Sequence, residues 1–382
     1  MLSTFSFATA TQVLFGNNSI AKIPELVNRW GNRVLIVSGK RQETAHDLAT
    51  RFLPGADVSY FQIHSEPTIE MIGRGVKIAR SAKCEYVIGI GGGSVIDAAK
   101  AIAAMVPNPG ELMDYLEVIG KGMPLVGKPL PCIAIPTTAG TGAEVTKNSV
   151  IKSNEKLVKV SLRSDSMYPT VALVDPVLTY SMSPELTAST GFDALTHLME
   201  TFVSNQANPF IDMICREGLK RVSHSLTDAF HDGQNSRARE DMSMASMLGG
   251  MALSNVKLGV IHGFAGPMGG MFHMAHGTIC ASLMAASMEM NIETLSEQKG
   301  DLSKFTELAQ ILTGSRLAQA EDGIVWVKNM VTGLKIPALS AFDISEPDFP
   351  ALVEKAKASS SMKGNPVLLN NEQLFRILEK SM

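Results

Sequence analysis

The stretch EYVIGIGGGSVIDAAKAIAAM, residues 85–105, carries the pattern that decides the fold of the first half of this 382-residue chain. Its opening EYVIGI is rich in β-branched and aromatic residues and predicts a buried strand. Three glycines, Gly91, Gly92 and Gly93, follow directly, and Ser94 begins a run of strong helix formers. We therefore expect a strand, a tight turn and a helix in immediate succession.

The turn at Gly91–Ser94 fits two interpretations. Glycine lets a backbone approach a ligand closely, and the first amides of a helix attract anions, so this loop is a candidate site for a pyrophosphate. A plain corner between a strand and a helix would use the same glycines. The spacing is not GxGxxG and the loop follows a later strand than the first, so the standard dinucleotide fingerprint is absent.

The segments around this stretch alternate between strand and helix patterns. Strands are predicted at 34–38, 58–63, 132–135 and 171–176, and helices at 43–52 and 68–82. Because alternation of this kind builds βαβ units, we expect a parallel sheet that is covered on both faces. The loop after the strand at 132–135 presents Thr137, Thr138 and Thr141 among glycines. Their hydroxyls could hold ribose or phosphate oxygens, and an ordinary polar turn would look the same.

Helix signals dominate the second half of the chain. Ser183 followed by Pro184 predicts a capped helix start, and we place a domain boundary there, between domains 1–182 and 183–382. Helical patterns recur at 241–253, 304–312, 348–358 and 372–380, the last preceded by a capping-box pair, Asn370 and Gln373. The second domain is therefore predicted to be all-α.

Four potential metal ligands lie in that helical half. Asp193 and His197 are four residues apart in GFDALTH, so both project from one face of a helix. His262 and His276 are separated by a glycine-rich stretch, for which we expect a turn that brings the two imidazoles together. An i,i+4 pair alone is more often a surface pair, but one carboxylate and three imidazoles form a ligand set for Zn²⁺ or Fe²⁺.

Composition limits the partners. The net charge of −3, from 34 basic and 37 acidic residues, gives no electrostatic basis for binding nucleic acid or a membrane surface, so a small-molecule partner is expected. The four cysteines are far apart and form no CxxC, which favours a reducing cytoplasm. The start of the sequence lacks the pattern of a secretory signal.

One long stretch invites a membrane interpretation. No charged residue occurs between Lys257 and Glu289, and a hydropathy window would mark a span there. We reject that interpretation because the stretch holds three histidines, Pro267 and the pair Gly269–Gly270, which fit a bent, buried region lined with ligands.

Several of these motifs together resemble the iron-containing (group III) alcohol dehydrogenases. The matches are GGGSVIDAAK (91–100), IPTTAGTGAEVT (135–146), ALVDP (172–176), GFDALTH (191–197), and GVIHG and AHG around His262 and His276. The resemblance implies a dehydroquinate synthase-like architecture, with an N-terminal α/β domain that binds NAD(P) and a C-terminal helical domain that binds the metal. It further implies a homodimer, a small alcohol or aldehyde as substrate, and Fe²⁺ as the expected ion with Zn²⁺ as the alternative.

The resemblance also assigns roles to single residues. It implies that the metal ligands are Asp193, His197, His262 and His276. It places the cofactor against Gly91, Gly92, Gly93, Ser94, Asp97, Thr137, Thr138 and Thr141, with Lys159 reaching toward the ribose or nicotinamide.

Two positions depart from the family pattern. Many members carry a proton-relaying histidine four residues after the one that matches His262, and this chain has Gly266 there. His273 is the candidate replacement, although a supporting role beside the ligands is equally open. Where NAD-specific members carry an acidic residue after the first strand, this chain has Gly39, followed by Lys40 and Arg41, which leaves room for a 2′-phosphate unless both basic side chains point into solvent.

These expectations define a leading function and two alternatives. The leading one is a metal-dependent NAD(P)-linked alcohol dehydrogenase, in which the metal polarises the substrate oxygen and the nicotinamide takes the hydride. A lyase like dehydroquinate synthase would use the same plan for transient oxidation, but it needs more Lys and Arg beside the metal ligands than this sequence offers. A non-catalytic metal or nucleotide binder would leave the complete ligand set unexplained.

Overall fold

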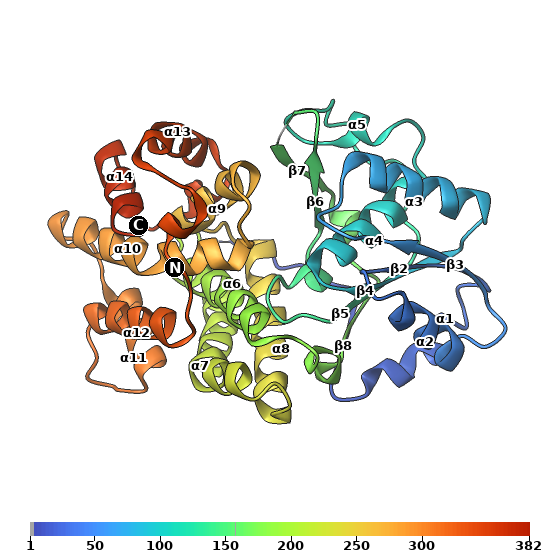
Figure 1. The fold of residues 1–382 in the computed structure, drawn as a ribbon, viewed down its shortest axis with the longest axis horizontal. Helices are drawn as coiled ribbons and strands as arrows, with labels where there is room; N and C mark the ends of the chain where they lie inside the picture. Colours follow the sequence, from blue (N-terminus) through green and yellow to red (C-terminus); the bar gives the residue numbers. More distant parts are fainter. Residues whose placement is uncertain (1–3, 157) are drawn as a thin grey trace. The chain divides into compact units, whose positions relative to one another are not determined.

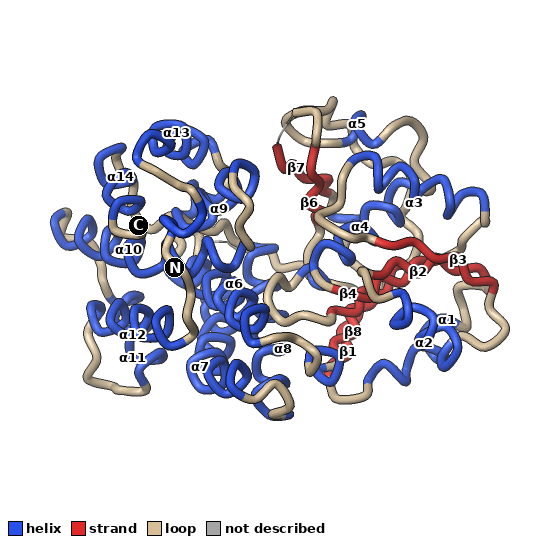
Figure 2. Tube along the Cα trace, in the orientation of Figure 1, coloured by secondary structure: helices blue, strands red, loops and turns tan. Residues whose placement is uncertain are grey.

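The computed structural model describes residues 4–156 and 158–382, which divide into two compact units. The α/β unit comprises residues 9–138 and 142–180, and the helical unit comprises residues 4–8, 139–141 and 181–382. Among the residues that the structure describes, Figure 2 shows strands in the α/β unit, whereas the regular elements of the helical unit are all helices. A parallel α/β domain followed by a helical domain was predicted, and this fold class is confirmed.

The α/β unit is built on a six-stranded parallel sheet in the order β1-β8-β5-β4-β2-β3. Its strands are β1 (Gln12–Phe15), β2 (Arg33–Ser38), β3 (Asp57–Gln62), β4 (Tyr86–Gly91), β5 (Cys132–Pro136) and β8 (Val171–Val174). The central strands pair in register, with Ile88 of β4 opposite Ile36 of β2 and Ile133 of β5. A separate antiparallel ribbon joins β6 (Asn148–Ser153) to β7 (Val158–Arg163).

Helices cover both faces of this sheet. They are α1 (Ile23–Val27), α2 (Gln42–Phe52), α3 (Ile69–Ser81), α4 (Gly93–Met105) and α5 (Leu112–Tyr115). Successive side chains of a strand point to opposite faces, so in β2 Leu35 and Val37 join the core under α3 and α4, whereas Val34 and Ile36 join the core under α1 and α2. Figure 1 shows these helix pairs on opposite faces of the sheet.

Glycine at position 89 sets how closely α4 packs on the sheet. A Cβ atom added there would lie 2.6 Å from the Cβ of Ala99, which is closer than two carbon atoms can approach. The pair Gly89 and Ala99 therefore lets the middle of α4 lie directly against β4.

In the described part of the helical unit, nine α-helices pack around a large apolar core. They are α6 (Pro184–Val203), α7 (Pro209–His231), α8 (Ser236–Asn255), α9 (Val260–Met271), α10 (His276–Glu297), α11 (Ser303–Thr313), α12 (Ala320–Gly333), α13 (Phe349–Ala358) and α14 (Asn371–Glu379). Short 3₁₀ turns in the chain lie at Ser19–Lys22, Ala143–Val145, Asp165–Met167, Pro176–Thr179, Leu339–Phe342, Glu346–Asp348 and Ser361–Gly364.

The two helix starts predicted from capping residues are observed. The Ser183 side chain accepts a hydrogen bond from the amide of Leu186, with Pro184 in the first helical position of α6. Asn370 and Gln373 form the reciprocal capping box that begins α14. The strand β1, the β6–β7 ribbon and the long helices α7, α10 and α12 were not predicted.

The prediction of a glycine-rich turn between His262 and His276 was wrong about the length of that turn. Gly269 and Gly270 belong to α9, which also contains Pro267, and the connection to α10 is only residues 272–275. Each helical glycine costs about 1 kcal/mol relative to alanine. Burial of the apolar face of α9, including Phe264, Ala265 and Met268, outweighs that local preference.

Among the described residues, no single helix has the length and hydropathy of a membrane span. The helices α8 and α9 meet that test only when they are joined, and the angle between them is 98°.

Candidate functional site

Helix α6 supplies the first two ligand candidates. Because Asp193 and His197 are one turn apart, they share the same face, and His197 Nε2 lies 3.5 Å from Asp193 Oδ1. Both side chains are buried within the helical unit. The i,i+4 spacing therefore produces the side-by-side placement that the sequence indicated.

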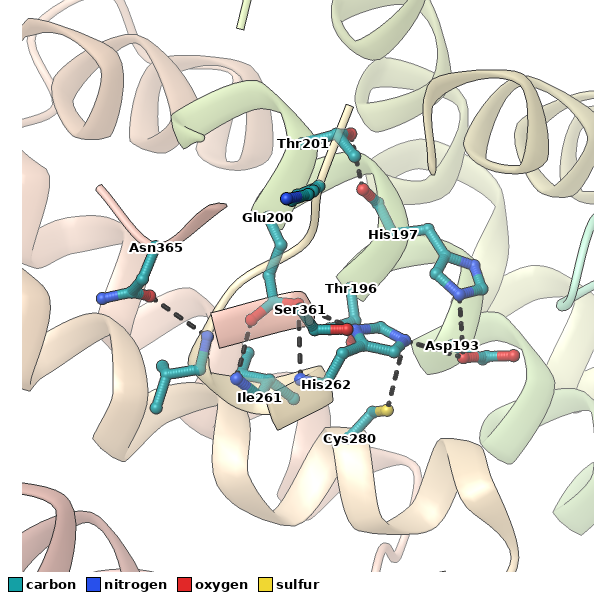
Figure 3. Close-up of polar contacts among 12 residues, drawn as sticks. Asp193, Thr196, His197, Glu200, Thr201, Ile261, His262, Cys280, Ser361 and Asn365 are labelled. Carbon is teal, nitrogen blue, oxygen red and sulfur yellow. Dashed lines mark hydrogen bonds and ion pairs between the residues drawn. The ribbon is translucent and has the colours of Figure 1, made fainter. Parts of the chain in front are cut away.

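Helices α9 and α10 bring the other two imidazoles to the same carboxylate oxygen. The Nε2 atoms of His262 and His276 each lie 3.7 Å from Asp193 Oδ1. The ring of His262 stacks on that of His197, with 4.7 Å between the ring centroids. Figure 3 shows Asp193, His197 and His262 facing one another. The side chain of His276 is 41% exposed, so the cluster is open on that side.

The contacts in this cluster have the spacing of ligands around an ion. Asp193 Oδ1 is buried and has no hydrogen-bond partner among the described residues. Distances of 3.5–3.7 Å to three imidazole nitrogens are too long for good hydrogen bonds. Two donors that are each about 2.1 Å from one ion at a tetrahedral angle lie about 3.4 Å apart. The residues present therefore fit a divalent cation.

The charge state of the cluster also suits a cation. Burial by itself would raise the pKa of the Asp193 carboxyl, but the imidazoles of His197, His262 and His276 hold it well below its usual range. Burial lowers the pKa of His197 to about 4. Near neutral pH the cluster thus holds an ionised carboxylate beside a neutral His197, whose lone pair is free to bind a metal.

Glu200, which was not predicted from the sequence, supports this cluster from the same helix. Glu200 is buried, and its Oε2 accepts a 2.7 Å hydrogen bond from Nδ1 of His262. Its Oε1 accepts a 2.7 Å bond from the backbone amide of Ile261, in the first turn of α9. The spacing Asp193, His197, Glu200 follows the i, i+4, i+7 face of a helix, a signal that could have identified it.

Cys280, one turn after His276 on α10, was also not predicted from the sequence. Its Sγ lies 4.0 Å from His262 Nε2, and the donor atoms of Asp193, His262, His276 and Cys280 all lie within 4.8 Å of one another. Burial would raise the pKa of the Cys280 thiol, but His276 and His262 lower it. Burial would likewise lower the pKa of both histidines, but the Cys280 sulfur and Asp193 raise it.

The two positions considered for proton relay are both exposed. His273 is exposed in the connection 272–275 and is not one of the donors that converge on Asp193. Gly266 is exposed on α9, and a Cβ atom added there would meet nothing within 4 Å. The chain therefore has space at residue 266 where a side chain would fit.

The glycine loop of the α/β unit lies where β4 and β5 end side by side. Gly91 is the last residue of β4, and its carbonyl accepts a 2.9 Å hydrogen bond from the amide of Thr137. Gly92 is the N-cap of α4, and a Cβ atom added there would lie 3.5 Å from Thr138 Oγ1. Gly93 and Ser94 form the first turn of the helix. Backbone amides, glycines and threonine hydroxyls thus gather at one helix N-terminus, as an anion site requires.

Two of the predicted cofactor residues have partners within the α/β unit. The Oδ2 atom of Asp97 accepts a 2.9 Å bond from the amide of Val150, and its Oδ1 lies 3.1 Å from Lys100 Nζ. Asp97 therefore joins α4 to β6. Lys159 on β7 pairs with Glu66, with 2.5 Å between Nζ and Oε1.

The remaining two predicted residues, Gly39 and Thr141, lie outside this loop. Gly39 directly follows β2, and a Cβ atom added there would be at an ordinary 3.8 Å from Val95 Cγ2. Thr141 belongs to the short segment 139–141, which clusters with the helical unit. The structure thus brings Gly91, Gly92, Thr137 and Thr138 together in one loop cluster.

Comparison with known proteins identifies the class. The family profile for iron-containing alcohol dehydrogenase matches residues 10–176, and the profile for the C-terminal part of the Fe-containing alcohol dehydrogenase family matches residues 187–382. Together they cover both units, so the chain belongs to the iron-containing alcohol dehydrogenase family. It is a metal-dependent alcohol dehydrogenase, and the resemblance stated from the sequence is confirmed.

Individual relatives agree with this assignment. Alcohol dehydrogenase 4 of Saccharomyces cerevisiae is 34% identical over 323 residues, which cover 84% of this chain and 82% of the yeast protein. A crystal structure of 1,3-propanediol oxidoreductase superposes with a TM-score of 0.92 at 28% identity over 100% of both chains. Sulfoacetaldehyde reductase from Bifidobacterium kashiwanohense, solved in complex with NAD⁺, gives a TM-score of 0.89 at 28% identity over 99% of both chains.

Proposed function

We propose that this enzyme interconverts a small primary alcohol and its aldehyde, using NAD(P) and a divalent ion held by Asp193, His197, His262 and His276. The observation that carries the proposal is the convergence of three imidazole nitrogens on a buried carboxylate oxygen that has no hydrogen-bond partner among the described residues. Three nitrogen ligands and one oxygen ligand suit Fe²⁺, which the family name also favours, and Zn²⁺ accepts the same set.

The protein's own residues hold and orient the reacting groups. When bound, the ion supplies Lewis acidity to the substrate oxygen, and the nicotinamide exchanges a hydride with the substrate carbon. Glu200 keeps a proton on Nδ1 of His262, so the Nε2 lone pair faces the ion site. Exposure on the His276 side leaves room for a substrate oxygen. The amides of Gly91–Ser94 bind the pyrophosphate, with Thr137, Thr138 and Thr141 toward the cofactor.

Two further residues complete the proposed cofactor site, and each has a partner in the present structure. Lys159 would exchange Glu66 for a ribose oxygen, whereas Asp97 supports the loop from α4. For proton transfer we assign His273, because residue 266 has no side chain and His273 is an exposed titratable group three residues before His276. Replacing His273 with Gln should lower kcat and remove one limb of its pH profile while metal content is unchanged.

Small alcohols and aldehydes are the proposed substrates. Two solved relatives act, by their names, on 1,3-propanediol and sulfoacetaldehyde, both short chains with a terminal oxygen. The absence of a side chain at residue 266 leaves space that a substituent on the substrate could occupy. A screen of short aldehydes, diols and hydroxy acids would rank the candidates by kcat/KM.

The test of the proposed function uses purified protein loaded with Fe²⁺ under anaerobic conditions, or with Zn²⁺. Loss of NADH or NADPH absorbance is followed with each aldehyde, and the product alcohol is identified by chromatography. Stoichiometric alcohol formation that disappears on chelation and returns with the ion supports the proposal. Oxidation of the cofactor with no alcohol formed, or turnover in fully metal-free protein, would overturn it.

Assembly and location complete the proposal. We infer a homodimer in a reducing cytoplasm, supported by family membership for the dimer and by four buried, unpaired cysteines for the compartment. Sedimentation velocity at several concentrations measures the first. Fractionation of the source cells, with the activity as a marker, measures the second.

A further inference from the structure

The sulfur of Cys280 faces the same nitrogen atom as the Asp193 carboxylate. Cys280 Sγ is 4.0 Å and Asp193 Oδ1 is 3.7 Å from Nε2 of His262. Figure 3 shows both contacts drawn from that one ring atom, with Cys280 on α10 and Asp193 on α6. Cys280 is fully buried, and its donor atom lies within 4.8 Å of those of Asp193, His262 and His276.

Hydrogen bonding does not account for this arrangement. Glu200 accepts a hydrogen bond from Nδ1 of His262, so Nε2 is the ring atom that faces both the carboxylate and the sulfur. One nitrogen cannot satisfy both the carboxylate and the sulfur, and the two distances exceed those of good hydrogen bonds.

Shared coordination of one ion accounts for all of these distances. A thiolate binds at about 2.3 Å and an imidazole nitrogen at about 2.1 Å, so at angles of about 110–135° the sulfur and nitrogen lie about 3.6–4.1 Å apart. The observed 4.0 Å falls within this range. Asp193 Oδ1, buried and without a hydrogen-bond partner among the described residues, is a second and independent sign that a cation belongs between these side chains.

We propose that Cys280 binds the ion as a thiolate, in the group of donors that it forms with Asp193, His262 and His276. The proposal rests on the divalent ion of the proposed function and goes beyond the four expected ligands. A thiolate is a soft ligand, so it shifts the relative affinity of the site toward Zn²⁺ and Co²⁺ compared with an all-nitrogen-and-oxygen set. Cys280 then helps to determine which ion this enzyme retains.

The other three cysteines lie outside this group of converging donors. Cys84, Cys132 and Cys215 are buried in hydrophobic cores. Cys215 on α7 contacts the hydroxyl of Thr201 at 3.2 Å and belongs to the same unit as Cys280. It is not among the donors that converge on Asp193, so Cys215→Ser is a matched control for the loss of a buried sulfur.

The test replaces the native ion with Co²⁺, whose optical spectrum reports its ligands. Metal-free full-length protein is titrated with Co²⁺ and followed in the visible and near-ultraviolet regions. Wild-type protein and Cys215→Ser should show visible ligand-field bands and an intense near-ultraviolet sulfur-to-cobalt charge-transfer band. Cys280→Ser and Cys280→Ala should lose the charge-transfer band and keep the visible bands. They should also bind Co²⁺ at least about tenfold more weakly, because even the loss of a residue that only supports a ligand lowers metal affinity by about that factor.

The outcomes separate this proposal from the one on which it rests. Stoichiometric Co²⁺ binding by wild-type protein without a charge-transfer band would overturn Cys280 ligation and leave the four-ligand site standing. A charge-transfer band that survives in Cys280→Ser would overturn it equally. Failure of wild-type protein to bind Co²⁺, or binding that Asp193→Ala does not weaken, would instead remove the metal site and with it the proposed function.

Discussion

Glu200 Oε2 accepts a 2.7 Å hydrogen bond from Nδ1 of His262, and both residues are buried in the helical unit. The same carboxylate accepts the amide of Ile261 at the start of α9. Helix α6 therefore supplies Asp193 and His197 and also orients the imidazole that α9 contributes. Residues that support a ligand in this way contribute to metal affinity without touching the ion.

Glu200→Gln should weaken metal binding by about 10–100-fold without unfolding the protein. The amide preserves the shape of the side chain but loses the charge that holds the proton on His262 Nδ1. Competition with a chromophoric chelator measures the affinity. Glu297→Gln, an exposed change near the end of α10, is the control. Equal metal affinity in Glu200→Gln and wild-type protein would show that the hydrogen bond between Glu200 and His262 does not affect metal binding.

Asp193→Ala and His262→Ala should each abolish metal retention and turnover while NAD(P)H binding persists. The ligand candidates belong to the helical unit, whereas the glycine loop belongs to the α/β unit, which has its own core. Elemental analysis, turnover and calorimetric titration are measured on one preparation. His224→Ala, an exposed histidine on α7, should behave as wild type. Full activity in metal-free Asp193→Ala would contradict the assignment.

Gly92→Val should weaken NAD(P)H binding and leave metal content normal. The structure tolerates a Cβ atom at residue 92, at 3.5 Å from Thr138 Oγ1, but a branched side chain there would occupy the approach to the amides of α4. Gly73→Val is the control, because a Cβ atom there meets nothing within 4 Å. If Gly92→Val binds NAD(P)H with the affinity of wild-type protein in a calorimetric titration, the pyrophosphate binds elsewhere.

NADP(H) should be used at least as well as NAD(H), and Gly39→Asp should shift the preference toward NAD(H). A carboxylate at the end of β2 would accept a bond from the ribose 2′-hydroxyl and repel a 2′-phosphate. The new Cβ atom fits, at 3.8 Å from Val95 Cγ2. The ratio of kcat/KM values for the two cofactors is the measurement. Gly39→Asn separates the effect of charge from that of size, and an unchanged ratio in Gly39→Asp would show that residue 39 does not contact the ribose.

Glu144→Gln should stabilise the protein above pH 7 and have little effect near pH 4.5. Burial raises the pKa of Glu144 to about 7 from 4.5, against the opposing charge of Lys100. A raised carboxyl pKa means that the folded state binds the proton more tightly, so this stabilisation is complete below pH 4.5 and is lost as pH rises through 7. Between pH 4.5 and pH values above 7, the free energy of unfolding of Glu144→Gln relative to wild type should therefore increase by an amount on the order of 3 kcal/mol.

Urea unfolding at pH 5 and pH 8 measures this difference. Glu43→Gln, an exposed glutamate on α2, should show no such change with pH. If the difference in the free energy of unfolding between Glu144→Gln and wild-type protein is the same at both pH values, Glu144 is already ionised in the folded state at pH 5.

Local sequence determined the elements that need few distant contacts. The apolar run of β4, the glycines after it and the helix formers of α4 specify a strand-turn-helix unit by themselves. The cap at Ser183 specifies where α6 begins. The four-residue spacing of Asp193 and His197 determines their shared helix face, since that geometry belongs to any α-helix.

Only the tertiary structure decided which residues far apart in the sequence contact one another. Glu200 and His262 are 62 positions apart, and Lys159 meets Glu66 across 93 positions, so no local period indicates either contact. Burial of α9 extended a helix through Gly269 and Gly270 against their local preference. Cys280 lies beside Asp193, His262 and His276 because α10 packs against both α6 and α9. Helix packing sets such contacts through the shapes of whole faces, which depend on every side chain in the core and not on the spacing of any one motif.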